Sequence, residues 1–195
     1  MTFGTTSRKR IADGSGWHPG VARYRRDVLV DDHVQVRTKG DIATGLAVPA
    51  GLVLAAVFGA IHAGFSIYWS MGGTWLVWSL GSNLQASFQG LEWILAPIGL
   101  AKLIAALAPM VLARRDWPVR RLTRSACWLG ALVLIGWGGV NTVVGNLVLA
   151  AVIQPQSGYD RPGMIGHAYL WDPLFLAWGV ALVIGLLASR NRTPQ

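Results

Sequence analysis

Charge is scarce in this sequence, and two long stretches carry none. Only 13% of the 195 residues are charged, whereas about a quarter are charged in an average soluble domain. No Asp, Glu, Lys or Arg occurs from Ile42 to Leu91, and none occurs from Ser125 to Tyr159. Stretches this long exclude an ordinary soluble fold and indicate that lipid is the solvent.

Several other signals are also missing. The only cysteine, Cys127, excludes an internal disulfide and is expected to pack as a small apolar side chain. The polar N-terminal stretch lacks the apolar core of a cleavable signal peptide. The pI is near 10.6, but the basic residues flank apolar segments, so no nucleic-acid partner is predicted. No catalytic, cofactor or metal-binding motif is present, so no cofactor or metal is predicted and a non-enzyme is favoured.

Four apolar segments are present, at about residues 44–69, 91–113, 125–153 and 168–189. Each has about the ~20 residues that a helix needs to cross a bilayer. Only helices satisfy their own backbone hydrogen bonds in lipid at this length. The predicted fold is therefore all-α: a polytopic membrane protein with a four-transmembrane-helix bundle over residues 42–195. A polar, largely disordered tail is predicted over residues 1–41.

Lysine and arginine are distributed very unevenly over the connecting segments. Fifteen of the 17 lie in the N-terminal tail, in the loop after the second span, or at the C-terminus. The loop from Ser70 to Gly90 has none, and the loop from Gln154 to His167 has only Arg161. Because cytoplasmic loops are enriched in these residues, both termini are predicted to be cytoplasmic. The abundance of arginine, alanine and glycine is typical of a GC-rich bacterial genome, so the membrane is expected to be the bacterial cytoplasmic one.

Small residues recur at intervals of four and predict the packing faces. The first span carries Ala56, Ala60 and Gly64, and the fourth carries Ala177, Ala181 and Gly185. Small side chains allow helix backbones to approach closely in a membrane. The third span contains five glycines and is therefore expected to be a crowded central helix: Gly130, Gly136, Gly138, Gly139 and Gly145.

The end of the first span carries a recognisable pattern: His62, then Tyr68-Trp69, then Gly72-Gly73 and Trp75. It resembles a family of small bacterial membrane proteins catalogued as domain of unknown function three-nine-nine-five. The last span, from Tyr169 through Asp172-Pro173 to Gly179, is similar to that family's closing segment. The resemblance covers about residues 50–189 and implies a four-helix membrane protein without an established activity. The chain departs from the pattern in its long tail and in Glu92 and Lys102.

Lys102 is the most informative polar residue of the predicted spans. It lies about eleven residues into the second span, roughly 16 Å along the helix and close to the bilayer centre. A charge there costs roughly 2.5–3.5 kcal/mol, so the side chain is expected to face other helices or a wet cavity. Two interpretations remain open: a working site, or a lysine that is neutral or reaches toward the interface and serves only packing.

The other candidate residues lie mostly toward the outer ends of the spans. Glu92 and Asp172 are either counter-charges for Lys102 or helix N-terminal residues; Asp before Pro is the usual start of a helix. His62 and His167 could ligate a metal or haem or relay protons, although a hydrogen-bonded histidine between helices is the commoner case. Tyr68 and Asn141 are further candidates for a polar site with Lys102. Asn141 and Asn146 are also expected to link helices by hydrogen bonds.

Three functions remain open. The favoured one is a non-enzymatic accessory, assembly or sensor protein, whose partners are the lipid bilayer and either a second copy or another membrane protein. The second is a small oligomeric transporter or proton-linked permease, with a pathway along Lys102, His62 and an outer carboxylate. The third is a membrane enzyme that acts on a lipid, quinone or haem through His62, Tyr68 and Glu92.

Overall fold

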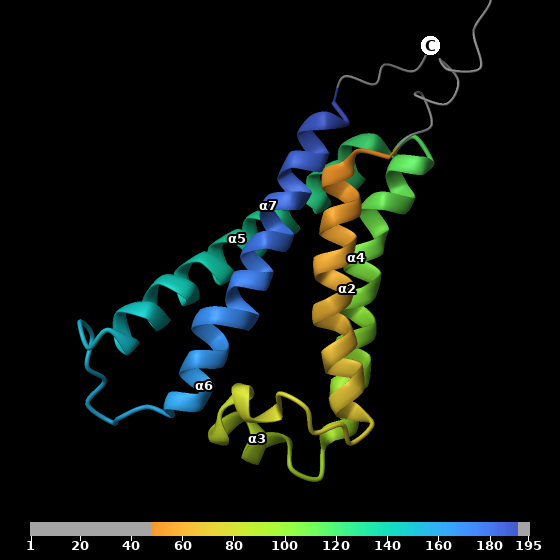
Figure 1. Ribbon diagram of the computed structural model, residues 1–195. Coiled ribbons are helices and arrows are strands. Elements are labelled where there is room, and N and C mark those ends of the chain that lie inside the picture. Colours follow the sequence, from red (N-terminus) through yellow and green to blue (C-terminus); the bar gives the residue numbers. More distant parts are fainter. Residues whose placement is uncertain (1–47, 191–195) are drawn as a thin grey trace, which may run out of the picture. The chain divides into compact units, whose positions relative to one another are not determined.

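The computed structural model describes residues 48–190, and every regular element in this part of the chain is helical, as predicted (Figure 1). Four helices are long and apolar enough to cross a membrane, so the chain is a multi-pass membrane protein. The predicted tail, residues 1–41, lies outside the described residues. The elements are α2 (Ala50–Ser70), η1 (Val77–Leu80), α3 (Ser82–Phe88), η2 (Glu92–Ile94), α4 (Leu95–Arg114), α5 (Arg120–Leu149), α6 (Arg161–Gly166), η3 (His167–Trp171) and α7 (Asp172–Ala188).

Three of the spans have different boundaries from those expected. The first, α2, begins at Ala50 and not near residue 44. The third, α5, begins at Arg120 and ends at Leu149, not at residues 125 and 153. The fourth begins at Arg161, not near residue 168, and continues through α6, η3 and α7 as one helical segment. Pro162 stands near the start of α6, where its missing N–H costs no helical hydrogen bond.

The spans contact one another in the order α4, α2, α7, α5. Helix α2 packs against both α4 and α7, and α7 packs against both α2 and α5 (Figure 1). In the most apolar 18 residues of each span, 44% of the residues are buried in α2 and in the fourth span, against 17% in the spans that contain α4 and α5. The central helices are therefore α2 and α7, and the prediction of α5 as a crowded central helix was wrong.

The small residues that bring α2 against its neighbours lie one position away from the predicted stripe. They are Gly51, Ala55, Gly59 and Ala63, of which both alanines are 0% exposed. A Cβ at Gly51 would lie 2.5 Å from the backbone nitrogen of Gly185. Gly64, which the predicted stripe included, is exposed and has no neighbour within 4 Å of such a Cβ. The four-residue repeat was correct, but of the predicted stripe only Ala56 is buried, so its register on α2 was wrong in part.

The partner faces on α7 and α5 also depend on small residues. Ala181 and Gly185 are buried on α7, as predicted. On α5, Gly138 packs against the backbone of Asp172 and Leu176, and Gly145 packs against Ala168. Two glycines of α5, Gly130 and Gly136, have no such neighbour.

Arg124 joins the start of α5 to the end of α7. Its guanidinium donates hydrogen bonds of 2.7 Å to the carbonyl oxygen of Leu186 and to Oγ of Ser189. It also lies 4.9 Å from the ring centroid of the buried Trp117. A cation that caps the last carbonyls stabilises a helix C-terminus. This contact brings the start of α5 and the end of α7 together.

Candidate functional site

A polar cluster lies inside the helical domain, where α4 packs on α2. Nζ of Lys102 is 3.3 Å from Nδ1 of His62 and 3.0 Å from Oγ of Ser66. His62 and Ser66 are one turn apart on α2 and are 6% and 2% exposed. The three side chains are called the Lys102 cluster below. The structure thus brings together two of the predicted site residues, Lys102 and His62.

When Lys102 is charged, only one assignment of donors and acceptors fits the hydrogen bonds of this cluster. An ammonium group can only donate, so Lys102 donates to Ser66 and to Nδ1 of His62. The hydroxyl of Ser66 in turn donates to the backbone oxygen of His62 at 3.4 Å. The proton of a neutral His62 is then on Nε2, which is buried and has no hydrogen-bond partner among the described residues. The cluster therefore presents donors, on Lys102 and on Nε2 of His62.

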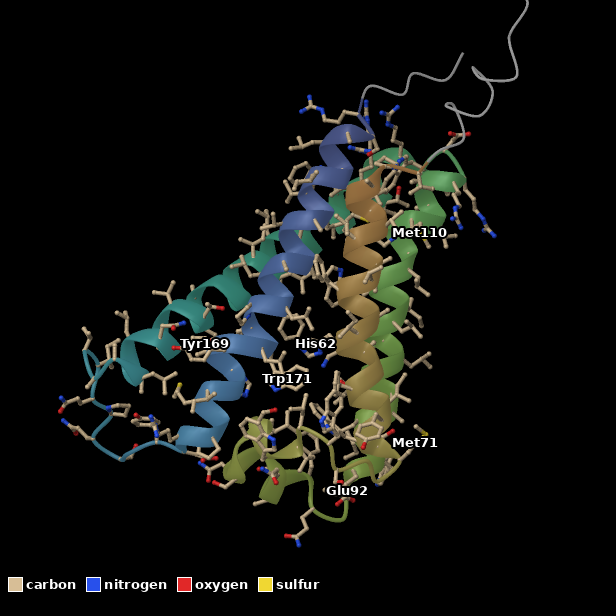
Figure 2. All side chains as sticks on the ribbon, in the orientation of Figure 1. His62, Met71, Glu92, Met110, Tyr169 and Trp171 are labelled. Carbon is tan, nitrogen blue, oxygen red and sulfur yellow. The ribbon has the colours of Figure 1, made fainter. Side chains whose placement is uncertain are left out.

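Aromatic rings of α2 and the fourth span cover the cluster. The His62 ring lies 4.0 Å from that of Phe175 and 5.7 Å from that of Trp171, centroid to centroid, and Figure 2 shows His62 and Trp171 close together. Lys102 Nζ is 5.7 Å from the Phe175 ring centroid. Phe65 and Trp69 pack against Trp171 farther along α2. These rings reduce the access of water, which makes the electrostatic interactions of Lys102 stronger.

No carboxylate pairs with Lys102 among residues 48–190. The one ion pair found there joins His167 and Asp172, with Nδ1 3.2 Å from Oδ2. Glu92 accepts a 2.9 Å hydrogen bond from the N–H of Gly90, so it holds the turn that leads into η2. In this structure neither predicted counter-charge neutralises Lys102.

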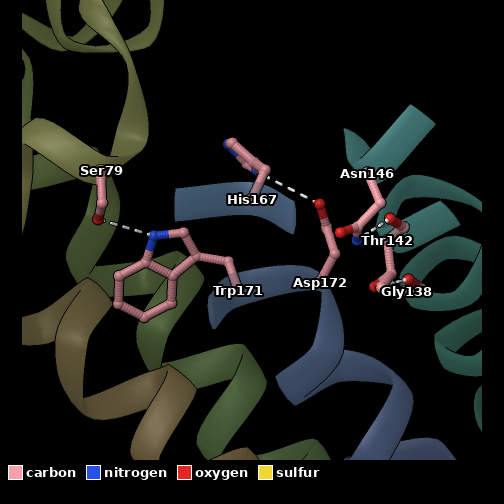
Figure 3. A network of polar contacts seen from close by, with 7 residues as sticks. All are labelled: Ser79, Gly138, Thr142, Asn146, His167, Trp171 and Asp172. Atoms are coloured by element: carbon pink, nitrogen blue, oxygen red, sulfur yellow. Dashed lines mark hydrogen bonds and ion pairs between the residues drawn. The ribbon is translucent and has the colours of Figure 1, made fainter. Parts of the chain in front are cut away.

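Asp172 lies within the fourth span, and the expectation that it begins this helix was wrong. Residues His167–Trp171 form a π-helical turn that joins α6 to α7, and the carboxylate of Asp172 reaches back across this turn to His167 (Figure 3). Asp172 is 2% exposed. A π-turn inside a helix is uncommon and is often found at functional sites. The Asp-Pro pair did not reveal it, because the same pair fits a helix start.

The family pattern at the end of α2 builds a closed turn and not an extension of the Lys102 cluster. The hydroxyl of Tyr68 accepts a hydrogen bond from the backbone N–H of Trp75, and the indole N–H of Trp69 donates to the Trp75 carbonyl. Gly72 has φ +85°, and a Cβ on Gly73 would collide with the Tyr68 ring. This explains why glycines follow Tyr-Trp. Tyr68, a predicted site residue, serves here as a structural contact.

The asparagines of α5 do not link helices by their side chains. Asn146 donates to the Thr142 carbonyl of its own helix at 2.7 Å, as Figure 3 shows. Asn141 is partly exposed and makes no side-chain hydrogen bond to another described residue. Asn141 therefore does not join the Lys102 cluster, and the interhelical role expected of both residues was wrong.

The segment between α2 and α4 is tied to the fourth span. The indole N–H of Trp171 donates to Oγ of Ser79 at 3.0 Å (Figure 3). Asp160 accepts a hydrogen bond from the N–H of Ser82. Gly166 packs so closely on Ser79 that a Cβ would overlap its backbone. These contacts hold Trp171 beside His62.

Sequence reasoning missed Ser66 and Phe175 as members or neighbours of the site. Ser66 could have been found, because it follows His62 by four residues and so lies on the same face of the helix. No pattern indicated Phe175, because an aromatic residue in an apolar span is ordinary. Among the described residues, no group of three or more His, Cys, Asp and Glu side chains could hold a metal ion.

Fold and site together define a helical multi-pass membrane protein with an ionisable cluster inside its membrane domain. The chain belongs to the family described as "Protein of unknown function (DUF3995)", which matches residues 58–182. This confirms the resemblance drawn from the sequence. No curated protein and no solved structure matches the chain. The matched region contains both His62 and Lys102.

Proposed function

We propose that this chain is a non-enzymatic accessory or sensor protein whose working site is the Lys102 cluster. In this proposal the cluster binds an electron-rich oxygen of a membrane-soluble ligand, such as a carboxylate, a phosphate or a carbonyl group. One observation carries the proposal: among residues 48–190, Lys102 has only neutral hydrogen-bond partners, at 3.0 and 3.3 Å.

The energetics of a charge within a membrane span support this assignment. A charged group at mid-membrane costs roughly 2.5–3.5 kcal/mol, and such residues usually face a partner or a pathway. His62, Ser66 and the Phe175 ring orient the ammonium group but do not neutralise it. A carboxylate or phosphate oxygen would supply the missing negative charge, and a carbonyl oxygen would supply a partial one. Each of these oxygens would accept from a donor that the protein leaves available.

Binding is tested by the molecules that co-purify with the protein. Wild-type protein and a Lys102→Met variant are purified in a mild detergent, and the extracts are compared by mass spectrometry. We expect an oxyanion or carbonyl compound enriched on the wild type and reduced by about tenfold on the variant, which corresponds to about 1.4 kcal/mol. Ile104→Met, at a 60% exposed position of α4, is the control and should retain the compound. Identical extracts from wild type and Lys102→Met would contradict the proposed ligand.

We further propose that the membrane is the bacterial cytoplasmic one and that both termini face the cytoplasm. The distribution of lysine and arginine supports this orientation. Reporter fusions at the two termini should be active only in the cytoplasmic form. A cysteine placed at Ser82, in a Cys127→Ser background, should react with a membrane-impermeant thiol reagent from outside. A periplasmic signal from either terminus, or no labelling at residue 82, would contradict this topology.

Proton-linked transport by an oligomer is the second candidate. It is favoured by the 3.3 Å contact between two basic nitrogens, Nζ of Lys102 and Nδ1 of His62, because such a pair can hold one proton in either of two places. Proton flux into liposomes distinguishes the two functions. Flux that Lys102→Met abolishes would favour transport, and equal flux with and without the protein would favour the binding function.

A further inference from the structure

The segment between α2 and α4 encloses a second potential site, independent of the Lys102 cluster. A cavity of about 750 Å³ lies between the end of α2, the turn and η1 that follow it, α3, and the start of α4. Its volume is within the range of about 300–1,000 Å³ that is usual for small-molecule sites. We call it the outer-loop cavity. No lysine or arginine occurs from residue 70 to residue 90.

Among the described residues that line this cavity, Glu92 has the only ionisable side chain. One carboxylate oxygen accepts the N–H of Gly90 at 2.9 Å, which fixes the orientation of the group at the start of η2. Since the lining contains no cation, the carboxylate gives the cavity a net negative charge. An anionic ligand is thereby disfavoured, and a cationic one is favoured.

Aromatic and amide side chains complete the lining. Trp69, Phe88 and Trp93 contribute rings, and Gln85 and Gln89 contribute amides. Trp93 is 64% exposed, so its ring is accessible to a ligand. Ring faces attract ammonium groups, and aromatic side chains with a nearby carboxylate are a common way to recognise organic cations.

One wall of the cavity is lightly held. None of the seven residues of α3 is buried, and its first residue, Ser82, donates its N–H to Asp160. A helix with few buried contacts can shift at little cost in free energy. Helix α3 can therefore adjust to a ligand while its N-terminal end stays attached to the fourth span.

We propose that the outer-loop cavity binds an organic ammonium group, with Glu92 as the charge partner and Trp93 and Phe88 as ring contacts. The ammonium group can belong to a soluble amine or to a lipid headgroup. This site does not depend on the function proposed for Lys102.

Isothermal titration of the full chain in phosphatidylglycerol nanodiscs tests the proposal, with choline as the probe. Its neutral isostere dimethylbutanol, in which carbon replaces the ammonium nitrogen, is titrated in parallel. We expect choline to bind and the isostere to bind at least about tenfold more weakly, because it lacks the charge. Glu92→Gln should weaken choline binding by about tenfold as well.

Two further variants separate recognition from folding. Ser87→Ala changes α3 at a residue outside the cavity lining and should leave choline binding unchanged. Trp93→Leu removes an exposed ring and should weaken choline binding without loss of folded protein. Nanodiscs that also contain phosphatidylethanolamine identify the source: competition with choline indicates a lipid headgroup, and its absence indicates a soluble cation. No choline binding, or equal binding of choline and isostere, would overturn the proposal, as would unchanged binding by Glu92→Gln.

Discussion

Gly51→Leu should strongly reduce the folded yield and the thermal stability of the protein in detergent. A Cβ at this position would lie 2.5 Å from the nitrogen of Gly185 and 2.8 Å from the oxygen of Ala181. Both are backbone atoms of the other central helix, so no side-chain rotation can relieve the overlap. Overpacking costs about 1–3 kcal/mol in ordinary cores, and we expect at least about 2 kcal/mol here because α2 and α7 would have to separate.

Gly64→Leu is the matched control on the same helix. It introduces the same side chain where nothing lies within 4 Å of the added Cβ. It should therefore be neutral or slightly stabilising, because glycine is a poor helix former. Thermal unfolding of the two variants, followed side by side in one detergent, measures the difference. Equal tolerance of both substitutions would show that Gly51 does not lie at a helix contact.

Lys102→Met should leave the protein at least as stable as the wild type while it removes the function. The substitution removes a charge that no described carboxylate neutralises, and this gain offsets the lost hydrogen bonds to Ser66 and His62. We expect the free energy of unfolding to be unchanged or to rise by up to about 1 kcal/mol. Unfolding should be measured after delipidation, because a bound ligand would add its own stabilisation.

Two other results for Lys102→Met would each indicate a different role for Lys102. A strong loss of stability in delipidated protein would indicate a buried partner for the charge, because removal of one member of a buried pair costs about 3–5 kcal/mol. Unchanged stability with unchanged function would indicate a lysine that is merely tolerated. Ile104→Met, on an exposed face of the same helix, is the control for the effect of a new methionine on stability and function.

The number and kind of helices could be predicted from the sequence because lipid imposes simple requirements. Each span must be apolar for about 20 residues, and the charge-free stretches show this directly. The order of packing could not be predicted in the same way. Small residues occur on several faces of α2, and the sequence does not state which face meets α7. Gly64 belongs to one four-residue repeat of small residues and Gly59 belongs to the other. A Cβ added at Gly59 would lie against Ala106 and Trp178, whereas nothing lies within 4 Å of a Cβ added at Gly64.

The sequence predicted the candidate site only in part. The cost of a charge in lipid identifies Lys102 without any structure, and His62 was a candidate because of its depth. Their direct contact depends on the rotation of α4 relative to α2, which the sequence leaves open. Asp172 was placed at a helix start because Asp-Pro is typical of one. The chain instead continues through a π-turn, where Asp172 pairs with His167.

Complementation tests directly whether Lys102 is a working residue of this membrane protein. A strain that lacks the gene receives wild type, Lys102→Met or Ile104→Met, each expressed to the same level in the membrane. Wild type and Ile104→Met should restore the phenotype, and Lys102→Met, although folded and inserted, should not. Full restoration by Lys102→Met would show that Lys102 is not a working residue.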